Sequence, residues 1–374
     1  MKTLSVSSSF SRFFGVLLQR IYLDWPLFAG ILLVFSAGEA VLYSASGPGF
    51  GVVWHQGVKF LIALVVMLAV AQVPPRRWRQ LSPPIYVGGL LLLVAVLGLG
   101  HVGLGARRWL DFGPVRIQPS EFMKLALPMM LAWLFSRQPL PIRFGMLLQA
   151  AVLMILPVLL IAKEPDMGTA VLIAMGALVI IFLAGAPFRF LVLGLAIGAS
   201  LLPLVWHFMH GYQRARILTF LDPQSAPLGA GYHIIQSMIA IGSSGMYGLG
   251  WPHAPQAQLG FLPESRTDFI FAVFGEEFGL LGSLALLATY VFIILRGLYI
   301  AWRASDNYSR LLAGCLSLTF AIDVFINIDM TMGLLPVVGV PLPLMSYGGT
   351  SLVSMGATMG LLQSIARHKP LVSA

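Results

Sequence analysis

The chain has 374 residues, of which 58% are hydrophobic and only 10% are charged, and its mean hydropathy is +0.88. Soluble domains carry roughly 25% charged residues, so this composition excludes a soluble globular protein. The net charge of +9 would suggest nucleic-acid binding in a soluble protein. Here the basic residues lie in short loops between apolar runs, which is typical of membrane orientation and headgroup contacts. We therefore expect membrane lipids, and no nucleic acid, as partners.

Apolar runs of about 20 residues, the length that crosses a bilayer as a helix, recur along the chain. They predict an all-α integral membrane protein with about ten transmembrane helices in a single polytopic domain over residues 1–374. The predicted spans are 25–44, 57–74, 84–101, 118–136, 144–162, 167–184, 187–208, 271–295, 308–330 and 348–366. The only cysteine, Cys315, lies in one of these runs and is expected to be a buried apolar residue.

Three segments outside the spans have their own predictions. Residues 1–24 are cytoplasmic or interfacial, and the stretch 10–18 reads as a short amphipathic helix on the membrane. Residues 209–270 form a long extracytoplasmic loop. Residues 331–347 carry no charge but contain prolines and glycines that break a helix. Irregular backbone at membrane depth survives only inside protein or beside a cavity, which predicts a re-entrant outer loop. A plain kinked connection is the alternative.

The distribution of Lys and Arg predicts the orientation. With the N-terminus in the cytoplasm, most basic residues fall on the cytoplasmic side, where Asp24 and Asp306 are the acids. The outer side carries both signs of charge, and orientation alone does not require acidic residues. The mixed charge therefore suggests a functional site on the outer side. An even number of spans returns the C-terminus to the cytoplasm.

The first candidate region is 103–124, where two arginines precede a helix that opens with Gln-Pro-Ser-Glu. Ser120 or a neighbour could cap this helix. Lys124 follows Glu121 by three residues, so both lie on one helix face. A capped helix with a local ion pair is one interpretation. Because Lys124 lies deeper in the membrane, where an unpaired charge is costly, a cavity is the other.

Three further regions carry charges at the ends of predicted spans. Asp166 begins a helix, either within a tight polar turn or as a carboxylate that faces a central cavity. Arg214 and Arg216 suit phosphate oxygens, with headgroup contact as the alternative. Asp268 could act as a general base or hold a divalent cation, whereas the residue pattern alone favours a helix N-cap.

These regions together resemble the SEDS family of peptidoglycan polymerases. The matching stretches follow one another over most of the chain: GARRWLDFGPVRIQPSEFMKL, EPDMGTA, YQRARILTFLDPQSAPLGAGYHIIQSMIAIGSSG, FLPESRTDFIFAVFGEEFGLLG and LLPVVGVPLPLMSYGGTS. The 214–268 region and the short N-terminus are more similar to the elongation-type members than to the division-type members.

The resemblance implies ten helices around a central cavity and a glycosyltransferase that polymerises lipid II, a disaccharide-peptide on undecaprenyl diphosphate. The reaction would take place at the outer face of the bacterial cytoplasmic membrane during cell elongation. The implied protein partners are a class B penicillin-binding protein transpeptidase and other elongation-complex membrane proteins. A lipid-precursor flippase and a non-catalytic scaffold for that transpeptidase are the alternatives.

The resemblance also implies roles for single residues. Asp268, in the TDFIF motif, is the expected catalytic residue. Its carboxylate would either activate the acceptor hydroxyl or hold a divalent cation, Mg²⁺ or Mn²⁺; no organic cofactor is expected. The predicted substrate-binding residues are Arg108, Glu121, Lys124, Asp166, Arg214, Arg216 and Ser346. The chain departs from the family where Asn-Ile-Gly-Met is common, because it has Asp329 there, with Asp323 shortly before. A carboxylate at this depth is costly unless it is protonated, paired or wet.

Overall fold

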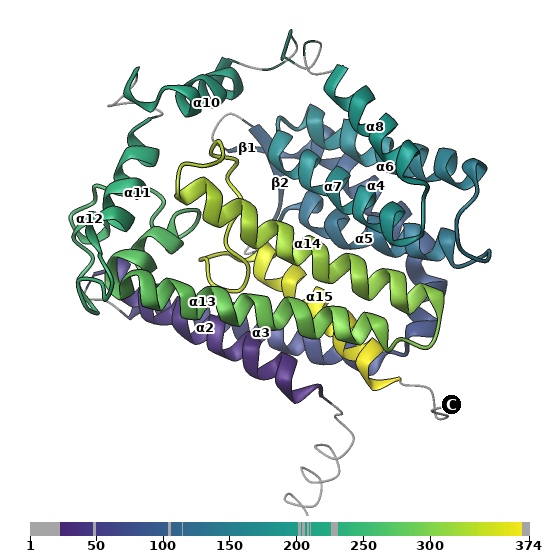
Figure 1. The fold of residues 1–374 in the computed structure, drawn as a ribbon, viewed down its shortest axis with the longest axis horizontal. Helices are drawn as coiled ribbons and strands as arrows, with labels where there is room; N and C mark the ends of the chain where they lie inside the picture. The colour runs from purple at the N-terminus through teal and green to yellow at the C-terminus, as the bar shows by residue number, and fades with distance from the viewer. Residues whose placement is uncertain are drawn as a thin grey trace, which may run out of the picture.

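The computed structural model describes residues 23–368, apart from 48–49, 104–105, 114, 201–202, 204–205, 208, 210 and 226–230. The amphipathic helix expected at residues 10–18 lies outside the described residues. Within the described part the chain is mostly helical, and each predicted span contains a helix (Figure 1).

The helices in the predicted spans have the following bounds: α2 (Trp25–Ala45), α3 (Gly51–Gln72), α4 (Pro75–Leu99), α5 (Pro119–Phe135), α6 (Phe144–Lys163), α7 (Met167–Leu183), α8 (Phe188–Ser200), α13 (Ile270–Trp302), α14 (Asn307–Thr331) and α15 (Thr350–Arg367). Six described helices, α2, α3, α4, α6, α13 and α14, are long and apolar enough to cross a membrane, and α7 and α8 are shorter apolar helices. The prediction of a polytopic helical membrane protein is confirmed.

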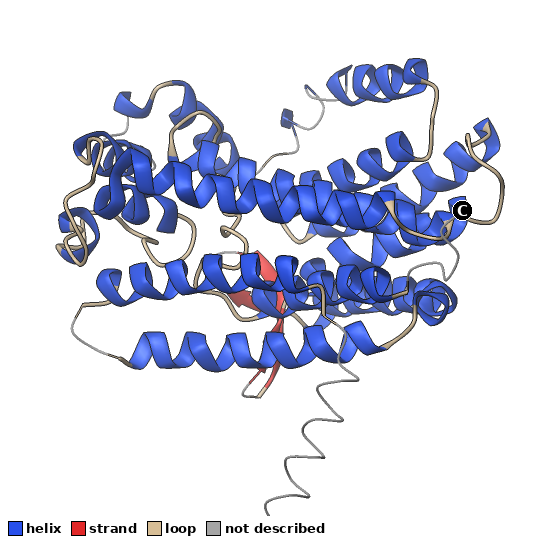
Figure 2. Cartoon of the chain, turned by 60° about the horizontal axis from the view of Figure 1, so that its bottom comes forward, coloured by secondary structure: helices blue, strands red, loops and turns tan. Residues whose placement is uncertain are grey.

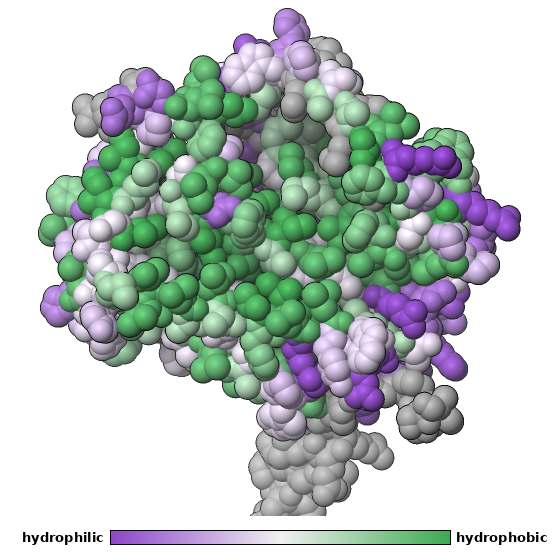
Figure 3. All heavy atoms as spheres, in the orientation of Figure 1, coloured by the Kyte–Doolittle hydropathy of each residue, from purple (hydrophilic) through white to green (hydrophobic). Residues whose placement is uncertain are grey.

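The long helices pack side by side, and Figure 2 shows their axes roughly aligned. α14 lies centrally and contacts α5, α7 and α13, while α15 packs along α3 and α2 packs against α13. Large apolar side chains on five helices point outward and are more than half exposed: Leu33, Leu61, Leu91, Leu159 and Phe325. Figure 3 shows such side chains over the middle of the molecule, with strongly hydrophilic residues gathered at its right-hand end. This is the surface that a lipid bilayer requires.

Aspartate side chains cap the N-termini of two of these helices. Asp24 accepts from the Leu27 amide at 3.2 Å and caps α2, and Asp306 accepts from the Ser309 amide at 3.1 Å and caps α14. A side-chain acceptor at this position satisfies an amide that the helix leaves without a partner. The two acidic residues assigned to the cytoplasmic side are therefore helix caps.

The loop before α5 differs from the prediction, because it forms a small antiparallel sheet. Its strands are β1 (His101–Gly103), β2 (Ala106–Phe112) and β3 (Val115–Ile117), in the order β1-β2-β3. Gly113, at φ 71°, provides the left-handed conformation of the turn between β2 and β3. Only a helix cap was predicted in this region, and the strands were not.

The predicted loop 209–270 contains short helices. They are α10 (Gly211–Leu221), the 3-10 turn η1 (Pro223–Ser225), α11 (Tyr232–Ser243) and α12 (Pro255–Gln258). Of these, α11 packs against the membrane helices, because it contacts α13 and α14. Residues 332–349 are irregular, and Val340, Leu342 and Leu344 within them are buried, as expected for a loop that re-enters the protein.

Candidate functional site

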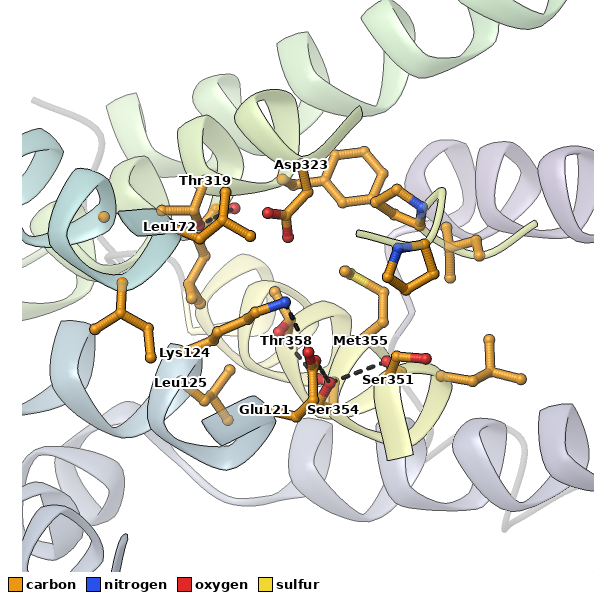
Figure 4. Close-up of a pocket in the computed structure, with 18 of the residues that line it drawn as sticks. Glu121, Lys124, Leu125, Leu172, Thr319, Asp323, Ser351, Ser354, Met355 and Thr358 are labelled. Atoms are coloured by element: carbon orange, nitrogen blue, oxygen red, sulfur yellow. Dashed lines mark hydrogen bonds and ion pairs between the residues drawn. The ribbon is translucent and has the colours of Figure 1, made fainter. Parts of the chain in front are cut away.

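A cavity of about 60 Å³ lies between α5, α7, α14, α15 and the irregular segment before α15 (Figure 4). This cavity has room for a few water molecules, since each water molecule needs roughly 10–15 Å³ of such volume. Its polar lining comes from three helices and from the irregular segment: Glu121, Lys124, Thr319, Asp323, Ser346, Ser351, Ser354 and Thr358. The predicted central cavity therefore exists, and three of the predicted substrate-binding residues line it.

Lys124 and Glu121 form an ion pair inside this cavity. The Lys124 Nζ lies 2.7 Å from Glu121 Oε1, and the Ser354 hydroxyl donates to Glu121 Oε2 at 3.2 Å. The local pair and the cavity were alternatives from the sequence, and the structure contains both. Ser120 does not cap α5, because Gln118 occupies the N-cap position and makes no side-chain cap bond.

Asp323 points into the same cavity from α14, opposite Lys124 (Figure 4). The negative charges of Glu121, Asp323 and Asp166 all act on the Lys124 ammonium. A carboxylate at this depth was expected to be protonated, paired or wet, and Asp323 has both a polar cavity and a nearby cation. With its ionisable groups charged, the cavity holds one positive and two negative groups.

Asp166 caps α7 and lies beside Arg108. Its carboxylate accepts from the Thr169 amide at 3.4 Å, from the Thr169 hydroxyl at 2.9 Å and from Gln118 Nε2 at 3.2 Å. Arg108 Nη1 lies 3.9 Å from Asp166, and the guanidinium also donates to the Pro165 carbonyl. The neighbouring Glu164 is fully buried, and this burial, with some help from Asp166, raises its pKa to about 8. The charged side chains at this turn therefore influence one another, since both Asp166 and Arg108 act on Glu164.

Asp268 lies outside the lining of this cavity, in a turn before α13. It is not the N-cap of α13, since Phe269 occupies that position without a side-chain cap bond. The favoured sequence interpretation was therefore wrong. The turn contains Glu264 at φ 53°, whose carbonyl accepts from the Phe269 amide at 3.2 Å, and α13 begins after Phe269 rather than directly after Asp268.

The surroundings of Asp268 perturb its acidity. Burial raises the pKa of Asp268 from 3.8 to about 6; the nearby Glu264 carboxylate adds to the rise, and the Arg216 guanidinium opposes it. The irregular segment 332–349 lies against this carboxylate at Gly339, where an added Cβ would be 3.4 Å from Asp268 Oδ2. Asn327 Nδ2 donates to the carbonyls of Asp268, at 2.9 Å, and of Val340. The carboxylate is thus held half-buried, near an arginine, with a pKa close to neutral.

Ser346 connects the cavity to the turn that carries Asp268. It lines the cavity, its hydroxyl donates to the Thr267 carbonyl at 2.6 Å, and it accepts from the Leu342 amide at 2.8 Å. Its role in the structure is to join the irregular segment to the residue before Asp268.

The two predicted phosphate-binding arginines of α10 diverge. Arg216 acts on the charge of Asp268 and donates to the Val337 carbonyl at 3.4 Å. Arg214 donates to the Trp206 and His207 carbonyls at 3.0 and 2.6 Å, so its guanidinium is directed towards that segment. The structure thus brings Arg216 to Asp268 and directs Arg214 elsewhere.

The geometry around Asp268 suits a base better than a metal ligand. A cation at Asp268 would have Glu264 as its second carboxylate and would face the positive charge of Arg216. A half-buried carboxylate with a pKa near 6 has the basicity that proton abstraction near neutral pH requires.

Sequence reasoning missed several residues of this site. Ser351, Ser354 and Thr358 follow one face of α15 at spacings of three and four, and that polar stripe in an apolar helix was the available signal. No comparable signal pointed to Asn327 as the residue that holds the Asp268 turn, because its contacts are distant in the chain.

Comparison with known proteins gives a consistent result. The model of the cell cycle protein family FtsW/RodA/SpoVE matches residues 17–371. The chain is 48% identical to the peptidoglycan glycosyltransferase MrdB of Escherichia coli K12, over 95% of this chain and 96% of the relative. It is 36% identical to the probable peptidoglycan glycosyltransferase FtsW of Idiomarina loihiensis, over 92% and 85% of the two chains.

Solved structures have the same fold. A chain from a study of the structural coordination of polymerization and crosslinking by a peptidoglycan synthase complex superposes with a TM-score of 0.79, at 33% identity, over 93% of this chain and 98% of that one. The rod shape determining protein RodA of Thermus thermophilus superposes with a TM-score of 0.72, at 28% identity, with the same coverage.

Proposed function

Because the chain belongs to the FtsW/RodA/SpoVE family of cell cycle proteins, which are SEDS proteins, we propose that it is a peptidoglycan glycosyltransferase of the RodA type. It polymerises lipid II into glycan strands at the outer face of the cytoplasmic membrane during cell elongation. The observation that carries this proposal is Asp268, a half-buried carboxylate with a raised pKa, held beside Arg216 and next to the segment that closes the cavity.

The reaction assigns a role to each of these groups. The 4-hydroxyl of an acceptor sugar attacks the anomeric carbon of a lipid-linked donor, and Asp268 accepts the hydroxyl proton. The new glycosidic bond forms as the bond from the anomeric carbon to the diphosphate breaks, and the electron pair leaves with the diphosphate-lipid. Arg216 is next to Asp268 and offers guanidinium donors to the diphosphate oxygens. Arg108, Lys124 and Arg214 remain candidates for further substrate contacts.

The same family membership supports a proposal for the partner and the location. We place the chain in the bacterial inner membrane with both termini in the cytoplasm, as the distribution of basic residues predicts. Its partner in this proposal is a class B penicillin-binding protein transpeptidase, which cross-links the strands that this chain makes. The solved relative concerned with coordinated polymerization and crosslinking supports such a pairing.

Asp268→Asn tests the proposal, with lipid II polymerisation by the purified protein as the assay. Asparagine has nearly the same size but carries no negative charge and is a poor base. General-base assistance is worth roughly 10² to 10⁴ in rate, so we expect a loss in that range. The folded yield and the binding of the transpeptidase should not change. Near-normal polymerisation by the variant would exclude Asp268 as the base.

The same assay separates the alternatives. A flippase relocates lipid II without lengthening it, so the parent protein would give no polymer in detergent. A scaffold would support cell growth equally well with Asp268→Asn, provided that partner binding is retained.

A further inference from the structure

The long helix α13 is interrupted close to its outer end. Gly279 has φ 65° and ψ −161°, which are not helical angles. A neighbouring loop pairs with the interrupted backbone: the Leu249 amide donates to the Glu276 carbonyl at 2.9 Å, and the Gly250 amide donates to the Glu277 carbonyl at 3.0 Å. The two adjacent glutamates, which the proposed reaction does not use, therefore lie at a junction between α13 and the outer loop.

The side chains of these glutamates are buried and largely without partners. Glu276 and Glu277 are each 1% exposed. One oxygen, Glu276 Oε1, accepts from the Gln256 amide at 3.2 Å. The other oxygen of Glu276, both carboxylate oxygens of Glu277 and the side-chain oxygen of Gln256 are buried without a hydrogen bond. The Ser44 hydroxyl accepts from Gln258 Nε2 at 3.2 Å, and it lies close enough to Glu277 to favour the charged form of that carboxylate. All four unsatisfied atoms are oxygen acceptors.

No counter-charge from the protein accompanies this pair. Among the described residues, no Lys, Arg or His forms an ion pair with Glu276 or Glu277, and none acts on their charge. Three other buried carboxylates in the described part of the chain do have such partners: Asp24 with Arg296, Glu121 with Lys124, and Asp166 with Arg108. The buried Glu164 forms no ion pair, but the positive charge of Arg108 acts on it. Two adjacent buried carboxylates without a cation are costly, so a ligand or protons must compensate them.

We propose that Glu276 and Glu277 bind a hard divalent cation that fixes the break in α13 to the outer loop. Its protein ligands are carboxylate oxygens of both glutamates and the Gln256 side-chain oxygen, with Ser44 nearby. Cations such as Mg²⁺, Mn²⁺ and Ca²⁺ prefer oxygen ligands, and water completes their coordination. One divalent ion balances both negative charges and gives the unsatisfied acceptors a partner. The site is structural and distinct from Asp268.

Thermal unfolding of the purified full-length protein in detergent, without substrate, tests this site. The protein is first treated with EDTA, and the chelator is removed. Mg²⁺, Mn²⁺ or Ca²⁺ is then titrated alone. We expect at least one ion to raise the Tm by a few degrees in a saturable way, because an ion that binds only the folded state stabilises it. Glu277→Gln and Glu276→Gln should lose the rise, whereas Asp268→Asn should keep it.

Two outcomes would overturn the proposal. If Asp268→Asn loses the rise and the glutamate variants keep it, the cation binds at Asp268. If no ion raises the Tm of the parent protein, the glutamates are a protonated pair. In case the glutamate variants do not fold, equilibrium binding of Mn²⁺ to Asp268→Asn decides, since bound Mn²⁺ supports the site and its absence contradicts it. No substrate is used, so a failure here leaves the glycosyltransferase proposal untouched.

Discussion

If Asp268 is the base, polymerisation should depend on pH with a midpoint set by its raised pKa. Burial and the Glu264 charge raise the pKa of Asp268 to about 6, so this carboxyl keeps its proton to a higher pH than an ordinary aspartate. The base must be unprotonated, and the rate should therefore rise with pH. With a pKa of about 6, roughly nine-tenths of the groups are ionised at pH 7 and about one-tenth at pH 5. We expect kcat/KM to fall about tenfold between these values.

Two substitutions should move this midpoint in opposite directions. Glu264→Gln removes a negative charge beside Asp268 and should lower its pKa, so the acid side of the profile moves to lower pH. Arg216→Gln removes a positive charge and should move it to higher pH. The measurement is kcat/KM for lipid II polymerisation from pH 5 to 8, with Tm recorded over the same range to exclude unfolding. A flat profile in the parent protein, or an upward shift in Glu264→Gln, would refute this account of Asp268.

Two further predictions concern orientation and the cavity. A cysteine at Ser265 should react with an impermeant thiol reagent from outside intact cells, and one at Ser305 only after permeabilisation; reversed labelling would contradict the proposed topology. Lys124→Ala and Asp166→Ala should each lower lipid II polymerisation while leaving the folded yield largely intact. If both variants simply lose thermal stability in detergent, these charges are structural.

The helices could be predicted from the sequence because each apolar run is long enough to cross a bilayer and needs no distant information. The pair of Glu121 and Lys124 was equally accessible, since three residues along a helix bring the two side chains to one face. The cap formed by Asp166 follows from its position before α7. What these successes share is a short separation along the chain.

The contacts that define the site depend on distant parts of the chain, so no local pattern contains them. Asp323 meets Lys124 only because α14 packs against α5. Arg214 and Arg216 are two residues apart on α10 and therefore point in different directions, which a phosphate-binding pattern does not reveal. The N-cap at Phe269 depends on the left-handed turn at Glu264. Sequence supplied the candidate residues, and packing determined which of them meet.

The charges of the site also indicate where a diphosphate can bind. In the cavity, Lys124 is neutralised by Glu121 at 2.7 Å and faces Asp323 as well, so no surplus positive charge remains there. Arg216, by contrast, is exposed and donates to the neutral Val337 carbonyl. A guanidinium has five N–H donors, which leaves several for phosphate oxygens. Since Arg216 also acts on Asp268, a diphosphate bound there would leave from a carbon within reach of the base. The carboxylates around Lys124 can accept hydrogen bonds from hydroxyl groups and do not attract phosphate oxygens.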